Sequence, residues 1–117
     1  MNIEAFRKYC LGLQGVEETF PFGPDTLVYK VFGKVFAITG LDEDEFRVNL
    51  KCDPERALEL REEYPEQIIP GWHMNKKHWN TVHFENGLPD KLVKELIDHS
   101  YELVFSGLPT SLKKQLK

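Results

Sequence analysis

The sequence predicts an α+β fold in which an antiparallel sheet is covered on one face by N- and C-terminal helices. Three observations lead to this fold class. Apolar residues recur at helical spacing near both ends of the chain, alternating or β-branched segments lie between them, and short turns join consecutive strands as hairpins. The length of 117 residues, 41% of them hydrophobic, fits one domain over residues 1–117.

The first half of the chain is expected to form one helix followed by strands. Ile3, Phe6 and Cys10 lie at helical spacing after Asn2, a residue type that caps helices, which predicts a helix over residues 3–12. Strands are expected over 17–22, 26–32, 34–39 and 46–51, the second and third forming a hairpin around Gly33.

The strand at residues 46–51 has the clearest alternation in the chain. Phe46, Val48 and Leu50 alternate with the polar residues Arg47, Asn49 and Lys51. Because successive side chains of a strand point to opposite faces, one face is expected to be buried and the other to carry two cations.

The second half of the chain is expected to contain two helices and two short strands. Asp53-Pro54-Glu55 is a strong helix start, with a capping side chain, proline at the first helical position and an acid in the first turn, and Pro65 ends this helix. Strands are expected at 68–69 and 81–84, linked by residues 72–79. Pro89 opens the longest helix, and a basic tail follows at 111–117.

The charge of the chain is negative overall and positive locally. The net charge of -4 and the pI near 5.6 argue against non-specific nucleic-acid binding, for which a basic domain is usual. The run Asp42 to Glu45 supplies four of the negative charges, and a hydrated hairpin tip is its expected role. No acidic residue lies between Glu66 and Glu85, where two lysines and three histidines occur.

The two cysteines are expected to be buried free thiols, because Cys10 lies on an apolar helical stripe and neither cysteine has metal-ligand spacing. Free thiols suit a reducing cytoplasm. The N-terminus lacks the pattern of a signal peptide, and no apolar run approaches the ~20 residues that span a bilayer. A cytoplasmic chain without membrane contact is therefore expected.

The segment from Pro70 to Val82 is the least generic part of the chain. It holds a dense group of cationic, aromatic and amide residues, namely Trp72, His73, Asn75, Lys76, Lys77, His78 and Trp79. Lysines can contact phosphates, and indole faces can stack on bases. The alternative is that both tryptophans anchor the core while the polar groups form a solvated turn.

Neither catalysis nor metal binding is expected from the motifs. His73, His78 and His83 are spaced five residues apart, which places neighbours on opposite faces of a strand and does not suit a helix. His99 and Ser100 are adjacent on a predicted helix and point in different directions. With no glycine-rich phosphate loop and no activated nucleophile, an enzyme is not expected, and no cofactor is implied.

The same segment carries a resemblance to the MmcQ/YjbR family. Residues 73–82, which read HMNKKHWNTV, resemble the central signature of that family. Other stretches agree in order and spacing, namely residues 9–11, 15–18, 48–55, 88–90, 100–101 and 107–109. The resemblance implies a CyaY-like fold, and members are described as double-wing DNA-binding proteins. Bacterial frataxins share that fold and handle iron, but a shared fold does not carry function over.

Two functions follow as expectations. In the first, the chain binds DNA or RNA weakly through Arg47, Lys51, Trp72, His73, Asn75, Lys76, Lys77, His78 and Trp79, with help from the cationic tail. In the second, a groove edged by Trp72, Trp79, His73 and His78 holds a protein or small-molecule partner. A monomer is expected in both cases. The first function depends on whether the cations gather into one patch.

Overall fold

The computed structural model describes residues 1–72 and 74–114. The helices are α1 (Ile3–Leu11), α2 (Pro54–Glu63), α3 (Asp90–Ser106) and the short α4 (Thr110–Lys113). The strands are β1 (Val16–Thr19), β2 (Thr26–Val31), β3 (Lys34–Gly40), β4 (Arg47–Lys51), β5 (Ile68–Pro70) and β6 (Trp79–His83).

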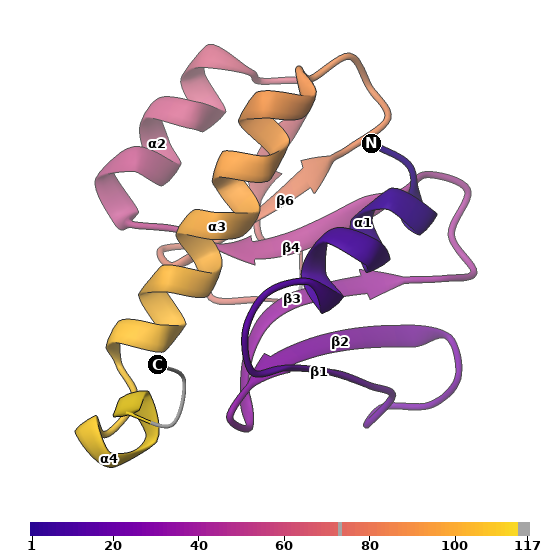
Figure 1. The fold of residues 1–117 in the computed structure, drawn as a ribbon. Helices are drawn as coiled ribbons and strands as arrows, with labels where there is room; N and C mark the ends of the chain where they lie inside the picture. Colours follow the sequence, from indigo (N-terminus) through magenta and orange to yellow (C-terminus); the bar gives the residue numbers. More distant parts are fainter. Residues whose placement is uncertain (73, 115–117) are drawn as a thin grey trace.

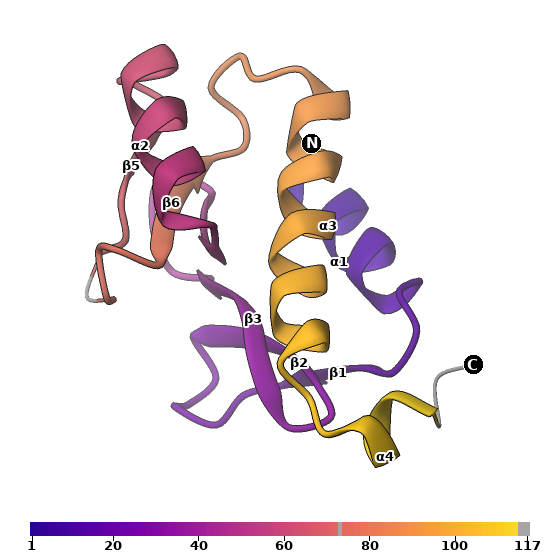
Figure 2. The same cartoon turned by 90° about the vertical axis from the view of Figure 1, so that its left-hand side faces the viewer.

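The strands form one antiparallel sheet in the order β1-β2-β3-β4-β6-β5. Helices α1 and α3 lie together across one face of this sheet, and α2 packs beside β5 and β6 (Figure 1). Figure 2 shows the same arrangement from the side, with α1 and α3 on one side of the strands. The predicted fold class, an antiparallel sheet covered on one face by the terminal helices, is confirmed.

The predicted helix starts are also confirmed. The Asn2 side chain accepts a hydrogen bond from the backbone N–H of Ala5 at 2.9 Å, and the Asp53 side chain accepts one from the N–H of Arg56 at 3.2 Å. Each bond satisfies a backbone donor that the first helical turn leaves without an intrahelical partner. These caps fix where α1 and α2 begin.

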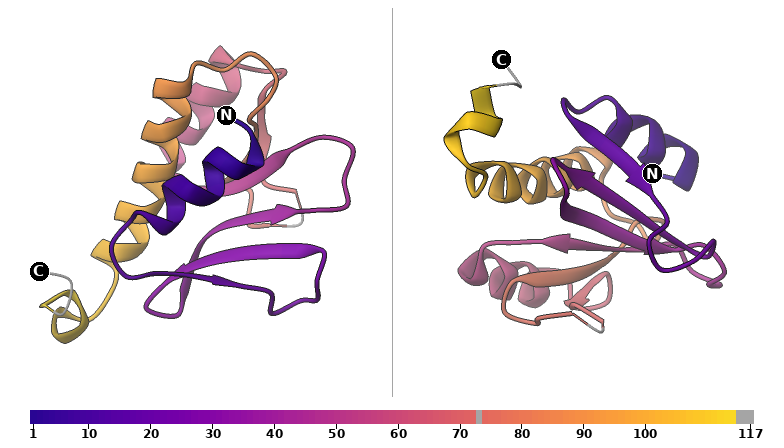
Figure 3. Two further views of the ribbon diagram at one scale, coloured as in Figure 1. Left: turned by 45° about the vertical axis from the view of Figure 1, so that its right-hand side comes forward. Right: turned by 90° about the horizontal axis from the view of Figure 1, so that it is seen from below.

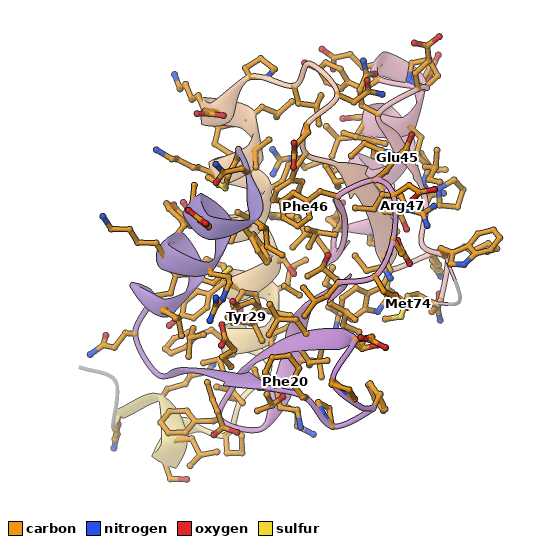
Figure 4. All side chains as sticks on the ribbon, turned by 90° about the vertical axis from the view of Figure 1, so that its right-hand side faces the viewer. Phe20, Tyr29, Glu45, Phe46, Arg47 and Met74 are labelled. Atoms are coloured by element: carbon orange, nitrogen blue, oxygen red, sulfur yellow. The ribbon has the colours of Figure 1, made fainter. Side chains whose placement is uncertain are left out.

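The alternation in β4 sets the two faces of the sheet. Val48 and Leu50 are buried in the core with the apolar stripe of α3, while Arg47, Asn49 and Lys51 are half-buried on the other face. Figure 4 shows Phe46 pointing toward α1 and Arg47 pointing away from it. The register places Ile38, Asn49 and Thr81 side by side on this second face, which α1 and α3 do not cover.

Ser100 joins α3 to the sheet. Its hydroxyl donates to the carbonyl of Phe36 and accepts a hydrogen bond from the backbone N–H of Lys51 at 2.8 Å. His99 accepts a hydrogen bond from the N–H of Asp53 at 3.1 Å, which links α3 to the start of α2. Both residues therefore have structural partners and point to different neighbours, as predicted from their adjacent positions on a helix.

Several element boundaries differ from the sequence prediction, and the largest differences are in β1 and β6. Strand β1 ends at Thr19 and not at Phe22, because Pro21 has no N–H to continue the ladder. Strand β6 begins at Trp79, two residues before the predicted start, since pairing with β4 continues to Lys51. Part of the basic tail forms α4. None of the helices in the described part of the chain has the length and apolarity that a bilayer crossing requires.

Candidate binding surface

The β5–β6 loop, defined as residues 71–78, is closed by its own backbone hydrogen bonds. The N–H of Gly71 donates to the carbonyl of Trp79 at 2.9 Å, and the N–H of Trp79 donates to the carbonyl of Asn75 at 3.0 Å. The Asn75 side chain accepts from the N–H of Lys77 at 2.9 Å, as in an Asx turn. The loop is therefore a defined turn and not an open connection.

Gly71 is required by close packing at the base of this loop. A Cβ at this position would lie 2.8 Å from the Cβ of Trp79 and 3.0 Å from the Cβ of Met74. Gly71 is buried, so little space is available for these neighbours to move away. Glycine is therefore required at position 71 because there is no room for a side chain.

Polar side chains on the uncovered face of the sheet hold one end of the loop. The N–H of Trp72 donates to the hydroxyl of Thr81 at 2.9 Å, and that hydroxyl donates to the Asn49 side chain. The Asn49 amide nitrogen in turn donates to the carbonyl of Trp72 at 3.4 Å. Because Asn49 and Thr81 are paired across β4 and β6, the sheet fixes the position of the Trp72 backbone.

Arg61 of α2 holds the other end of the loop. Its Nε donates to the side chain of buried Asn80 at 2.7 Å, and its Nη2 donates to the carbonyls of Lys76 and Trp79. Sequence reasoning did not find Arg61, since the residue lies fifteen positions before Lys76 on a different element. No motif in the sequence of α2 indicates that Arg61 contacts the loop.

The loop presents most of the predicted side chains at the surface. Trp72 is 55% exposed, Asn75, Lys76 and Lys77 are exposed, and His78 and Trp79 are half-buried. The interpretation of Trp72 as a core anchor is therefore wrong. Its backbone is bonded to Thr81 and Asn49 on the face of the sheet that α1 and α3 do not cover, so Trp72 is held at the surface and not in the core between the sheet and these helices. His73 lies outside the described residues.

Lys51 joins the loop cations at the end of β4. It lies directly opposite Trp79 in the β4–β6 register, next to the point where the Cys52 N–H donates to the carbonyl of His78 at 2.8 Å. Among the described residues, no carboxylate lies within 4.0 Å of the ammonium group of Lys51, Lys76 or Lys77. These three charges are therefore available to an anionic ligand.

Arg47 does not belong to this surface, contrary to the sequence prediction. Its guanidinium donates to Glu43 Oε2 from Nε at 3.1 Å and from Nη2 at 2.8 Å, so its charge is neutralised. Glu45 and Arg47 lie together at the acidic hairpin tip (Figure 4), and Glu45 also pairs with His83 at 3.2 Å. At about 3.4 Å per residue, Arg47 is roughly 14 Å along β4 from Lys51.

The described part of the cationic tail does not belong to this surface either, and residues 115–117 of the predicted tail lie outside the described residues. Helix α4, which contains Lys113, lies at the end of α3, on the opposite side of the molecule from the β5–β6 loop (Figures 2 and 3). The predicted cations therefore form separate groups. Only the group at the loop combines exposed lysines with an exposed indole.

The hollow beside the loop is lined by different residues from the predicted groove of tryptophans and histidines. It has a volume of about 180 Å³ and lies between the loop and α2, lined mainly by apolar surface of Pro54, Glu55, Leu58, Arg61, Lys76 and Lys77. Leu58 is 63% exposed here. The hollow is small, and it places exposed Leu58 near Lys76 and Lys77.

The buried cysteines and His99 are not activated for catalysis. Cys10 and Cys52 are both buried, and burial raises the pKa of the Cys52 thiol to about 11 and that of Cys10 further still, so neither is a thiolate at neutral pH. Burial lowers the pKa of His99, with Arg56 as a smaller cause. Within residues 1–72 and 74–114, no three histidine, cysteine or acidic side chains gather as a metal site.

The fold defines a class of small α+β proteins with one six-stranded antiparallel sheet. Comparisons with known proteins place the chain in one family of that class. The sequence model of the YjbR family matches residues 11–103. The uncharacterised protein YbdF of Escherichia coli O157:H7 is 37% identical over 114 residues, covering 97% of this chain and 93% of YbdF. The protein YjbR of Escherichia coli K12 is 33% identical, covering 99% and 98%.

Solved structures agree with these sequence matches. The crystal structure of protein DR2400 from Deinococcus radiodurans superposes with a TM-score of 0.90 at 42% identity, covering 98% of this chain and 87% of DR2400. A crystal structure from Pseudomonas syringae superposes with a TM-score of 0.75 at 28% identity, covering 89% and 99%. The chain belongs to the YjbR family, which confirms the resemblance seen in its sequence.

Proposed function

We propose that this protein is a non-catalytic nucleic-acid-binding protein that holds a single-stranded segment weakly on the β5–β6 loop. One observation carries the proposal: exposed Trp72 shares a braced loop with Lys76 and Lys77, and no described carboxylate reaches these lysines. Indole faces stack on bases of any sequence, and lysines contact the phosphates between them.

The shape of the surface favours a single strand over a duplex. The protruding element is a turn held by Thr81 and Arg61, whereas duplex readers commonly insert a helix or a two-stranded ribbon into a groove. Unpaired bases are available for stacking, and paired bases are not. The description of MmcQ/YjbR proteins as DNA-binding agrees with a nucleic-acid ligand.

The electrostatics support weak binding. Three lysines at the loop, Lys51, Lys76 and Lys77, can neutralise about three phosphates, each contributing a slope of about 0.7 in log affinity against log salt on a single strand. The acidic tip at residues 42–45 and the net charge of -4 oppose the approach of a polyanion. Binding is therefore expected at low salt and only weakly at physiological salt.

The double variant Lys76→Glu/Lys77→Glu is expected to weaken binding of a fluorescein-labelled oligothymidylate at least tenfold in low salt. The slope of log affinity against log salt should fall by about 1.4, because two contacts at ~0.7 each are lost. Fluorescence anisotropy at several salt concentrations measures both quantities.

The matched control for this experiment is Lys113→Glu/Lys114→Glu. It makes the same change in net charge on the opposite side of the molecule, so its affinity should stay within about twofold of the unmodified protein. No anisotropy change for the unmodified protein at low salt would contradict the proposal. Equal losses of affinity in the two double variants would show that the effect comes from net charge and not from the loop.

Trp72→Ala is expected to lower the affinity for the same oligonucleotide by about 5- to 150-fold, since base–aromatic stacking contributes roughly 1–3 kcal/mol per base. The salt slope should not change, because no charge is removed. Phe22→Ala is the control, since Phe22 is 72% exposed on a different loop. An unchanged affinity for the Trp72 variant would show that the bases do not stack on this indole.

A second candidate function is supported by the hollow beside exposed Leu58. Its apolar walls and its lysine rim fit an apolar side chain of an acidic peptide. The two candidates are distinguished by the anisotropy experiment. Failure of oligonucleotides to bind would favour the peptide, and loss of oligonucleotide binding confined to the loop variants would favour nucleic acid.

A further inference from the structure

A second hollow lies between α1 and α3, on the helix side of the sheet. Its volume is about 490 Å³, within the roughly 300–1,000 Å³ that is usual for small-molecule sites. Its apolar floor comes from Ala5, Tyr9, Gly12 and Leu13, and its exposed surface is mostly apolar. Lys8 of α1 and Lys94 of α3 also line it.

Asp90, the acidic residue in the groove lining, and Asp98, which contacts Tyr9 of the lining, already have partners. At one end, Asp90 pairs with the Met1 ammonium group at 3.1 Å. Farther along, Asp98 accepts a hydrogen bond from the Tyr9 hydroxyl at 2.7 Å. Burial, and then the neighbouring Asp98, raises the pKa of Tyr9 to about 12, so the phenol remains a neutral donor. These contacts tie Met1, and Tyr9 of α1, to α3.

The two lysines, in contrast, keep their charge for a ligand. No carboxylate in the described part of the chain lies within 4.0 Å of the ammonium group of Lys8 or Lys94. Lys94 Nζ lies 5.9 Å from the centre of the Tyr9 ring, directly over the groove floor. An apolar floor with two ammonium groups at its edge is complementary to a molecule that has an alkyl chain and one anionic end.

We propose that the groove between α1 and α3 binds a small anionic amphiphile, an alkyl carboxylate whose chain lies on Ala5, Tyr9 and Leu13. Its head group is placed between Lys8 and Lys94, since these cations alone line the groove without a carboxylate partner within the described residues. The site is independent of the β5–β6 loop. The helices α1 and α3, whose residues line the groove, and the β5–β6 loop lie on different sides of the sheet (Figure 3).

The test is a two-dimensional ¹H–¹⁵N NMR titration of the full chain with sodium decanoate below its micelle-forming concentration. Chemical shifts should move for Ala5, Tyr9, Gly12 and Lys94 and saturate together. Decanol, which has the same chain and no charge, should bind at least fivefold more weakly. Lys8→Glu/Lys94→Glu should lower the affinity for decanoate at least tenfold. Lys113→Glu/Lys114→Glu should keep that affinity within twofold of the unmodified protein.

Three results would overturn the proposal. The first is equal binding of decanol and decanoate, and the second is an unchanged affinity in Lys8→Glu/Lys94→Glu. The third is shifts spread over other exposed apolar residues, such as Phe22 and Leu58, which would show general adsorption of a detergent-like molecule. Lys8 and Lys94 are both exposed, so their replacement is expected to leave the fold intact. The amide spectrum of the double variant without ligand checks this, since it should match that of the unmodified protein away from the two substitutions.

Discussion

Phe6→Ala is expected to lower the free energy of unfolding by about 3–5 kcal/mol, the usual loss when a buried phenylalanine is truncated. Phe6 is fully buried and lies at the centre of an aromatic cluster. Its ring packs edge-on against Tyr29 at 5.4 Å, Phe46 at 5.6 Å and Phe84 at 5.4 Å between centroids. These partners lie in β2, directly before β4 and directly after β6, so one side chain of α1 joins the helix to three parts of the sheet.

Urea unfolding followed by circular dichroism measures this loss. At about 4 °C per kcal/mol for a domain of this size, the melting temperature should fall by roughly 12–20 °C. The control is Phe22→Ala, which makes the same substitution at a side chain that is 72% exposed and should change stability by less than about 0.5 kcal/mol. Similar losses in both variants would mean that the aromatic cluster does not hold α1 on the sheet.

Gly71→Ala is expected to destabilise the protein by about 1–3 kcal/mol and to displace the β5–β6 loop. The added methyl group would meet the Cβ and the carbonyl oxygen of Trp79 at 2.8 and 3.0 Å, closer than a real Cβ packs. Since the backbone of β6 is fixed by pairing with β4, the loop is the part that moves. Oligonucleotide affinity should fall with it, even though no ligand-contacting side chain is altered.

The control is Gly107→Ala, because Gly107 also ends a regular element but has φ -81° and only ordinary contacts, the nearest at 3.5 Å. Its stability should be unchanged or higher by up to about 1 kcal/mol. Urea unfolding measures the stability of both variants, and the indole N–H signals of the NMR spectrum report the loop. Unchanged indole signals together with unchanged stability in Gly71→Ala would contradict the packing explanation.

Much of the fold could be predicted because its signals are local. Asn2 and Asp53 cap their helices through backbone groups three residues away, and alternation in β4 distinguishes a buried from a polar face within five residues. The wrong start of β6, unlike the wrong end of β1 at Pro21, depends on a partner elsewhere in the chain. Strand β6 begins at Trp79 because Lys51 of β4 is available to pair with it.

The binding surface could be predicted only in part. The exposed Lys76 and Lys77 follow from an acid-free, polar stretch of sequence, but the exclusion of Arg47 and the bracing by Arg61 do not. Whether a charge is neutralised depends on which carboxylate lies within a few ångströms, and this is decided by the folded chain. Glu43 reaches Arg47 because the hairpin turns between them.

By itself, the sequence determined the fold class, the helix starts, the two faces of β4 and the family of this protein. The tertiary structure decided which cations share a surface, which of the two tryptophans is exposed, and that α1 and α3 enclose a second groove. The physical reason is one of range. Capping and side-chain alternation act between residues a few positions apart, whereas charge neutralisation and burial depend on contacts between residues that are distant in sequence and become neighbours only when the sheet forms.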